Sequence, residues 1–268
     1  MLNWLDTVIL GLIEGVTEFL PVSSTGHLLI AERWLEARGD VFNSVIQCGA
    51  VVAVVMVFAG RLKSFYKDWR APETQSYLMK LAVAFVITGM GGLALKAAGF
   101  KQQDESAEHA RMVAWVVAWT TLGGGVVILL LEQWLKGRKL ESEVTWTVAL
   151  AAALAQLLAV VLPGTSRSAS TILAALALGT TRPVATEFSF LLGVPTLLAA
   201  GLLQTCSALK HGQAVDWTAV ALGTAVSAVT AFGVVKWLLR YVQTHTFTLF
   251  GWYRIALGVV ILWVLKKS

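Results

Sequence analysis

The chain has 268 residues, of which 57% are hydrophobic and only 14% are charged. About a quarter of the residues of a soluble domain are charged, so this composition excludes a soluble enzyme, a disordered chain and a coiled coil. It predicts an integral membrane protein that forms one domain over residues 1–268. The formal net charge of +5 is then expected to come from cytoplasmic loops rather than from a surface that binds nucleic acid.

Several apolar stretches, nearly free of charge, have the character of transmembrane helices, which need about 20 residues. They are Val41–Gly60, Leu81–Leu95, Met112–Leu131, Val144–Leu162, Phe188–Leu209, Trp217–Val235 and Phe247–Leu265. Helices are expected because backbone groups in lipid must find their hydrogen bonds within the segment. The prediction is an all-α, polytopic helical bundle, in which Val41–Gly60 either crosses the membrane or turns back.

Two further apolar segments are interrupted by polar residues. Leu2–Leu20 contains Asp6, Glu14 and Glu18 and stops at Pro21, while the segment after Pro163 has only about 14 residues between Arg167 and the next arginine. Interrupted segments are tolerated at membrane depth only where protein or a water-filled cavity surrounds them. They predict two re-entrant or broken helices.

These two interrupted segments resemble each other. Residues 20–26 (LPVSSTG) can be aligned with residues 162–168 (LPGTSRS) at an offset of 142, and Glu14 then matches Gln156. We interpret the chain as an internal repeat with halves of approximately 1–135 and 144–268. An odd number of crossings between the copies would make the repeat inverted, with a site at its interface. The alternative is that the short shared string arose by chance.

Loop charges predict an orientation. Residues 61–70 carry a net charge of +3 and residues 136–139 hold three basic residues, whereas residues 101–109 carry −2. Because positive loops stay in the cytoplasm, the two basic loops are expected inside and residues 101–109 outside. Lys266 and Lys267 favour, more weakly, a cytoplasmic C-terminus.

Glu14 and Glu18 are four residues apart and share one helix face. Two carboxylates inside a bilayer are costly and repel each other, and a hard divalent cation such as Mg²⁺ or Ca²⁺ would offset both effects. The pair therefore predicts a metal site. The alternative is a face near the membrane surface whose carboxylates reach water.

Hydroxyl-rich segments follow each interruption: Ser23, Ser24 and Thr25 in the first, and Thr165, Ser166 and Ser168 in the second. Such residues cap helix N-termini, and two N-termini that face one point can bind an anion. Arg167 adds a planar cation suited to phosphate, and His27 can exchange a proton near neutral pH. The alternative is capping alone, with Arg167 paired to a carboxylate. The functional interpretation is phosphate chemistry on a lipid-borne substrate.

Residues 14–27 (EGVTEFLPVSSTGH) resemble the signature of the bacterial undecaprenyl-diphosphate phosphatases, the bacitracin-resistance family. Residues 163–168 (PGTSRS) are similar to the second motif of that family, and Glu187–Leu192 and Tyr253–Arg254 to further segments. The second motif of the family usually continues with glycine, where this chain has Ala169, although Thr171 keeps its place. This departure affects fine positioning rather than the resemblance itself.

The resemblance implies hydrolysis of undecaprenyl diphosphate to undecaprenyl phosphate and inorganic phosphate, which recycles the lipid carrier for peptidoglycan synthesis. It implies a polyprenyl diphosphate substrate, a divalent cation, and a site in the bacterial inner membrane that opens toward the outer face. The residues it implies are Glu14 and Glu18 for metal and catalysis, Ser24, His27 and Arg167 for catalysis, Ser23, Thr25, Gly26, Thr165, Ser166, Ser168 and Thr171 for the phosphates, and, less directly, Glu187 and Arg254. The attacking group stays open between Ser24, His27 and a water molecule, and the oligomeric state is not predicted.

Two other classes of protein fit part of the pattern. A lipid transporter or flippase would also have a repeat and broken helices, but it needs no metal-dependent release of phosphate. A structural membrane protein would not account for so many polar residues in apolar segments. The unrelated acid-phosphatase type is excluded, because Ala71 stands where its first motif has proline and no histidine follows Arg167 at the required distance.

Overall fold

The protein is helical throughout the part that the computed structural model describes, which covers residues 4–35, 39–99 and 107–267. An isolated bridge between Glu141 and Thr180 is the one extended pairing in those ranges. The helices are α1 (Trp4–Thr17), α2 (Ser24–Ala31), α3 (Asp40–Val57), α4 (Ala59–Lys67), α5 (Pro72–Ala97), α6 (Ala107–Leu135), α7 (Trp146–Val161), α8 (Arg167–Ala177), α9 (Arg182–Lys210), α10 (Trp217–Tyr241) and α11 (Thr248–Lys266).

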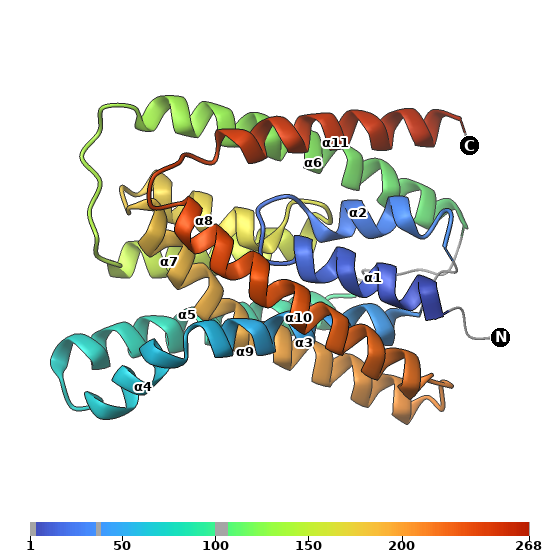
Figure 1. The fold of residues 1–268 in the computed structure, drawn as a ribbon, viewed down its shortest axis with the longest axis horizontal. Helices are drawn as coiled ribbons and strands as arrows, with labels where there is room; N and C mark the ends of the chain where they lie inside the picture. The colour runs from blue at the N-terminus through green and yellow to red at the C-terminus, as the bar shows by residue number, and fades with distance from the viewer. Residues whose placement is uncertain (1–3, 36–38, 100–106, 268) are drawn as a thin grey trace.

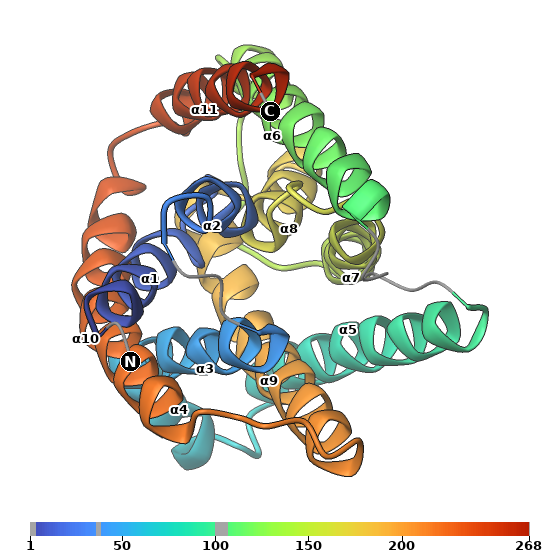
Figure 2. The same cartoon turned by 90° about the vertical axis from the view of Figure 1, so that its right-hand side faces the viewer.

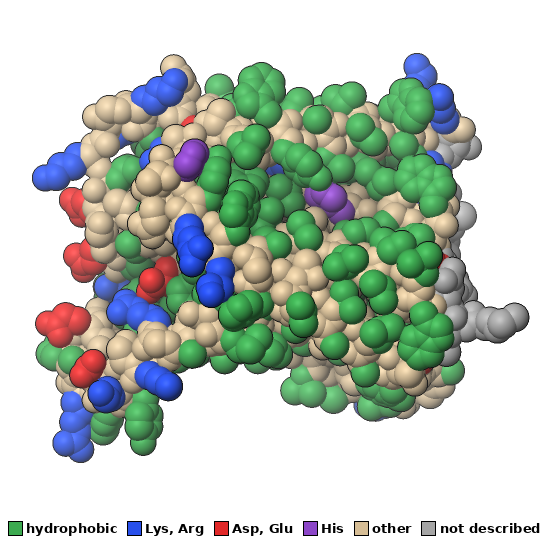
Figure 3. All heavy atoms as spheres, viewed as in Figure 1, with side chains coloured by type: hydrophobic (Ala, Val, Ile, Leu, Met, Phe, Trp, Pro, Cys, Tyr) green, Lys and Arg blue, Asp and Glu red, His purple; other side chains and the backbone are tan. Residues whose placement is uncertain are grey.

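The long helices confirm the prediction of a multi-pass membrane protein. Of the described helices, α5, α6, α9, α10 and α11 are each long and apolar enough to cross a membrane. The predicted span Val41–Gly60 is instead a broken one, because α3 and α4 meet at a bend of 62°. Hydrophobic side chains cover the middle of the face in Figure 3, whereas charged side chains gather mostly toward its two ends, as a bilayer requires.

Two short helical hairpins occupy the interior, as predicted for the interrupted segments. The pairs α1–α2 and α7–α8 enter from opposite ends of the molecule and turn back near its middle (Figure 1). The bridge between Glu141 and Thr180 shows that the second hairpin returns to the end from which it came. The prediction that Val144–Leu162 crosses the membrane is therefore wrong, because α7, with 16 residues, is too short to span a bilayer and forms the first arm of this hairpin. This is the arrangement that an inverted repeat produces.

The long helices surround these hairpins. Viewed along the molecule, α2 and α8 lie near the centre, with α6 and α11 on one side and α3, α9 and α10 on others (Figure 2). Two glycines let α1 approach α10 closely. A Cβ atom at Gly15 would lie 2.6 Å from the carbonyl oxygen of Ser227, and one at Gly11 would lie 2.7 Å from that of Gly223. Small residues at helix contacts are the usual means of close packing in membranes, and here they fix the helix that carries Glu14.

The positions of the loops test the predicted orientation in part. The basic segments 61–70 and 136–139 lie at the same end of the molecule (Figure 1), as expected. Residues 100–106 lie outside the described residues. The prediction that the C-terminus shares the end of the basic loops is wrong, because α9, α10 and α11 make three crossings after α8 and bring it to the opposite end.

Candidate active site

The two hairpins turn at a pair of matching helix caps. Ser23 caps α2 and Ser166 caps α8, with φ angles of 74° and 69°, and these are the two non-glycine residues with positive φ among those described. Each side chain accepts a hydrogen bond, Ser23 from the backbone N–H of Gly26 and Ser166 from that of Ala169. Left-handed backbone is strained for serine and is found mostly at functional sites. The caps align at an offset of 143 rather than 142, because the second cap lies three residues after its proline and the first only two.

Arg254 of α11 holds both turns in place. Its side chain is fully buried, and its three nitrogens donate to carbonyl oxygens of both hairpin turns and of α6. The partners at 3.1 Å are Thr120, Thr121, Gly164 and Thr165, and Pro21 lies at 3.5 Å. Because these carbonyls use its donors, Arg254 positions the two turns rather than offering a fork to phosphate.

Replacing Arg254 with methionine is expected to destabilise the protein by about 3–5 kcal/mol, because several buried carbonyls lose their donor at once. For a chain of this size the melting temperature in detergent should fall by roughly 10 °C. The same substitution at Arg240, which is exposed at the end of α10, should leave the melting temperature unchanged. Equal melting temperatures for both variants would contradict the positioning role.

Glu18 connects the two halves of the repeat. Its Oε2 accepts a hydrogen bond from Ser24 Oγ at 3.0 Å, and its Oε1 lies 3.4 Å from Arg167 Nη2. Ser24 and Arg167 are the first residues after the two caps, so they occupy equivalent places in α2 and α8. The carboxylate is 7% exposed. The predicted catalytic residues Glu18, Ser24 and Arg167 therefore meet in one buried group, although 149 residues separate the ion pair.

Arg167 lies in a close-fitting cage. Its guanidinium lies over the ring of Phe19, 5.1 Å from the centroid, and Nη1 donates to the Ser189 carbonyl at 3.4 Å. A Cβ atom at Gly193 would come within 2.8 Å of Cζ, so a larger residue there would push the guanidinium out of its present place. The Nε atom is buried without a hydrogen-bond partner among the described residues. The guanidinium of Arg167 is thus held in place while its Nε–H group still lacks an acceptor.

Glu14 is buried beside this group, with a solvent exposure of 0%. Neither of its carboxylate oxygens has a hydrogen-bond partner among the described residues, and the same is true of the side-chain amide of Gln156 in the second half. An unsatisfied buried carboxylate is far more costly than an unsatisfied amide. No described side chain provides a positive charge or a donor to the Glu14 carboxylate, so a bound metal cation would satisfy both of its oxygens.

His27 is held by hydrogen bonds at both ring nitrogens. Nδ1 lies 2.7 Å from the carbonyl oxygen of Ser23, and Nε2 lies 2.6 Å from the hydroxyl of Tyr253 on α11. Because a carbonyl only accepts, Nδ1 carries the proton of the neutral imidazole, and Nε2 accepts from Tyr253. The two rings stack with their centroids 5.6 Å apart. The lone pair of Nε2 is thus occupied by the Tyr253 hydroxyl, which fixes the orientation of the ring.

Tyr253→Phe is expected to lower the rate of substrate turnover between about two- and tenfold, the value of one hydrogen bond that orients the imidazole. The phenyl ring keeps the stacking with His27, so the melting temperature should stay within a degree or two. Tyr66→Phe, at a tyrosine that is 85% exposed, is the matched control. A wild-type rate in Tyr253→Phe would show that this hydrogen bond does not orient His27.

The remaining predicted phosphate-binding residues lie around the same group, with differing access. Thr25 is exposed, and Gly26 is buried against α11. The other hydroxyls make internal hydrogen bonds: Ser168 with Leu20, Thr165 with Leu162, and Thr171 with Ser189. Both the capping and the ion pair between Arg167 and Glu18 are what the alternative interpretation expects. That interpretation does not explain why the carboxylate oxygens of Glu14 and the Nε atom of Arg167 are buried without hydrogen-bond partners.

Glu187 is not part of this group. It lies at the end of the basic loops, where its Oε1 is 3.0 Å from Arg61 Nε on α4. Sequence reasoning missed three residues that line the group: Thr121, within 3.5 Å of Ser23 Oγ and of the Gly164 carbonyl, Ser189 and Tyr253. Ser189 and Tyr253 carried a signal, because both lie in segments that resemble the family.

The fold and the site define a polytopic membrane protein whose interior holds two helix N-termini, a caged guanidinium and paired carboxylates, a set suited to a phosphate group. The chain belongs to the family of bacitracin resistance protein BacA, which it matches over residues 7–260.

Named relatives span almost the entire chain. A protein of Rhizobium etli (strain CIAT 652), named undecaprenyl-diphosphatase, is 46% identical over 97% of both chains. Proteins of the same name from Xylella fastidiosa (strain 9a5c) and Xanthomonas euvesicatoria pv. vesicatoria (strain 85-10) are 45% and 43% identical, over 98% of this chain and 98% and 97% of theirs.

Proposed function

We propose that this protein hydrolyses undecaprenyl diphosphate to undecaprenyl phosphate and inorganic phosphate in the bacterial inner membrane. The single observation that carries the proposal is the group in which Glu18 joins Ser24 of one half to Arg167 of the other. The name shared by its relatives supplies the substrate. The reaction regenerates the lipid carrier of peptidoglycan synthesis, and bacitracin resistance follows from faster removal of its diphosphate form.

The residues divide the work between binding and proton transfer. Arg167 and the N–H groups after the two caps would hold the diphosphate, displacing the guanidinium partly from Glu18. His27, whose ring is oriented by Tyr253, would take or give the proton at Nε2 once the Tyr253 hydroxyl turns away from it. Ser24, His27 and a water molecule remain the candidates for the attacking group. Positioning and charge stabilisation supply most of the rate in such reactions.

A divalent cation, Mg²⁺ or Ca²⁺, would bind at Glu14 and Glu18. No group of three or more His, Cys, Asp or Glu residues able to hold a metal ion occurs within the described ranges. Mg²⁺, however, is commonly held by one or two carboxylates together with water and substrate phosphates. The two orphaned oxygens of Glu14 fit this role. The cation would neutralise the charge of the phosphate, while Arg167 and the N–H groups at the two caps would orient the phosphate.

The site is proposed to open toward the outer face. The hairpin that carries Ser23, Ser24 and His27 enters from the end opposite to the basic segments 61–70 and 136–139 (Figure 1). Under the positive-inside rule those segments face the cytoplasm. A diphosphate head group exposed at the outer leaflet would then reach His27 directly.

The experiment that tests this function is phosphate release from undecaprenyl diphosphate in detergent, with Mg²⁺ or Ca²⁺ and then with EDTA. Release that needs the cation supports the proposal. A well-folded protein that releases no phosphate, but moves a fluorescent polyprenyl lipid across a vesicle membrane, would favour the transporter instead.

A further inference from the structure

A pocket of about 260 Å³ lies between α2, α6 and α11, at the end of the molecule opposite to the basic loops. Nine residues line it, and seven of them are apolar. The two exceptions are Arg33, in the turn that follows α2, and Arg111 on α6. The residues of the candidate active site are not among those that line it.

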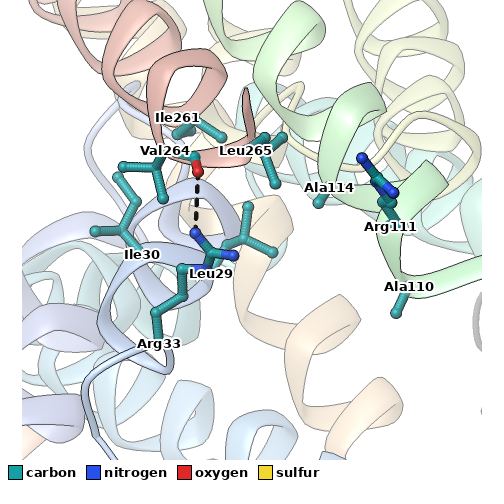
Figure 4. A pocket seen from close by; sticks show the side chains of 9 residues that line it. All are labelled: Leu29, Ile30, Arg33, Ala110, Arg111, Ala114, Ile261, Val264 and Leu265. Carbon is teal, nitrogen blue, oxygen red and sulfur yellow. Dashed lines mark hydrogen bonds between the residues drawn. The ribbon is translucent and has the colours of Figure 1, made fainter. Parts of the chain in front are cut away.

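The two arginines stand on opposite sides of the pocket, with the aliphatic side chains of α11 beside them (Figure 4). Arg33 is held in position by a hydrogen bond from Nη1 to the carbonyl oxygen of Val264, 3.1 Å away. Both arginine side chains are exposed. The pocket therefore combines two guanidinium groups with an apolar wall.

The tryptophans place this pocket at the level of the lipid head groups. Trp34 follows Arg33 directly and is 73% exposed, and Trp263, next to Val264, is 59% exposed. Lys267 lies over the Trp263 ring, 3.8 Å from its centroid. Exposed tryptophans with neighbouring basic residues mark the boundary between hydrocarbon and water. A ligand here would meet water at one end and acyl chains at the other.

We propose that this pocket binds the phosphate of an anionic phospholipid of the surrounding leaflet. The phosphodiester would lie between Arg33 and Arg111, and the glycerol and first methylenes would contact the apolar wall. Drug-sized ligands occupy about 300–1,000 Å³, so this smaller volume suits a head group and not a peptide segment. Charge complementarity and the level in the membrane both favour a lipid over a soluble anion.

The bound lipid would connect the helices that carry the catalytic group. Arg33 lies in the turn after α2, six residues beyond His27, and Arg111 lies on α6, which also carries Thr121. A phosphate shared by both arginines would link α2 to α6 across α11, the helix of Tyr253. This consequence depends on the proposed function, whereas binding of the lipid itself does not.

The test measures binding, independently of activity. Purified wild-type protein in neutral detergent is heated with increasing phosphatidylglycerol or, separately, phosphatidylcholine. Phosphatidylglycerol should raise the melting temperature by roughly 5 °C, and phosphatidylcholine should not. The variant Arg33→Gln/Arg111→Gln should lose this rise. Lys266→Gln/Lys267→Gln, which removes two charges at the same end but outside the pocket lining, should keep it.

Because Arg33 also binds the Val264 carbonyl, Arg111→Gln alone serves as a second variant that leaves that contact intact. It should lose at least half of the rise. The proposal is overturned if the pocket variants respond like wild type, if phosphatidylcholine acts equally well, or if wild type shows no rise. It is also overturned if undecaprenyl phosphate abolishes the rise at a lower concentration than phosphatidylglycerol produces it, since the pocket would then belong to the substrate.

Discussion

Arg167→Ala is expected to lower phosphate release from undecaprenyl diphosphate by a factor of about 10²–10³, the usual cost of removing one donor that stabilises developing oxyanion charge. The guanidinium is caged between Phe19, Ser189 and Gly193, with Nε unsatisfied. The substitution removes the positive charge that is paired with the Glu18 carboxylate. The measurement is the initial rate at saturating substrate.

Two further variants make this result specific. Arg167→Lys keeps the charge but not the planar fork, so it should recover less than a tenth of the lost rate. Arg138→Ala removes an exposed arginine at the basic end and should retain the wild-type rate. Retained activity in a folded Arg167→Ala protein would contradict the proposed site.

Glu14→Gln is expected to lower the rate by about 10²-fold or more and to weaken its dependence on Mg²⁺ or Ca²⁺, because one of only two carboxylates for the cation becomes neutral. The fold should tolerate the change, since Gln156 occupies the matching place in the second half and is itself buried. The rate is measured across a series of cation concentrations, with the melting temperature recorded in parallel.

The matched control for Glu14→Gln is Gln156→Met. It replaces a buried amide without a partner by an apolar side chain of similar shape, which is nearly neutral for stability. This variant should keep both the rate and the cation response. A Glu14→Gln protein with wild-type cation dependence would show that the metal binds elsewhere.

Sequence periodicity predicted the helices well because a bilayer imposes a simple length and polarity rule. It could not predict that Val41–Gly60 breaks at Phe58, between α3 and α4. Nor could it show where the C-terminus lies, since two lysines are a weak signal beside the number of crossings. The re-entrant hairpins were predictable because Pro21 ends a segment that contains three carboxylates, and because the segment after Pro163 contains Arg167 and is too short to cross.

The candidate site was predictable where chemistry is local. Glu18, Ser24 and His27 lie within ten residues of one another, and a capping pattern places them at one helix end. The pairing of Glu18 with Arg167 depends on the tertiary fold and leaves no local pattern. The same holds for Arg254, whose carbonyl partners come from three separate segments, and for Tyr253, which reaches His27 from 226 residues away.

A double-mutant cycle on Glu18 and Arg167 tests whether the two halves of the repeat build one site, with phosphate release measured for Glu18→Gln, Arg167→Ala and both together. Residues that act as one unit lose little more when both are changed than when one is. The double variant should therefore be no more than about threefold slower than the slower single variant. Losses that multiply would contradict a single site built by the two halves of the repeat.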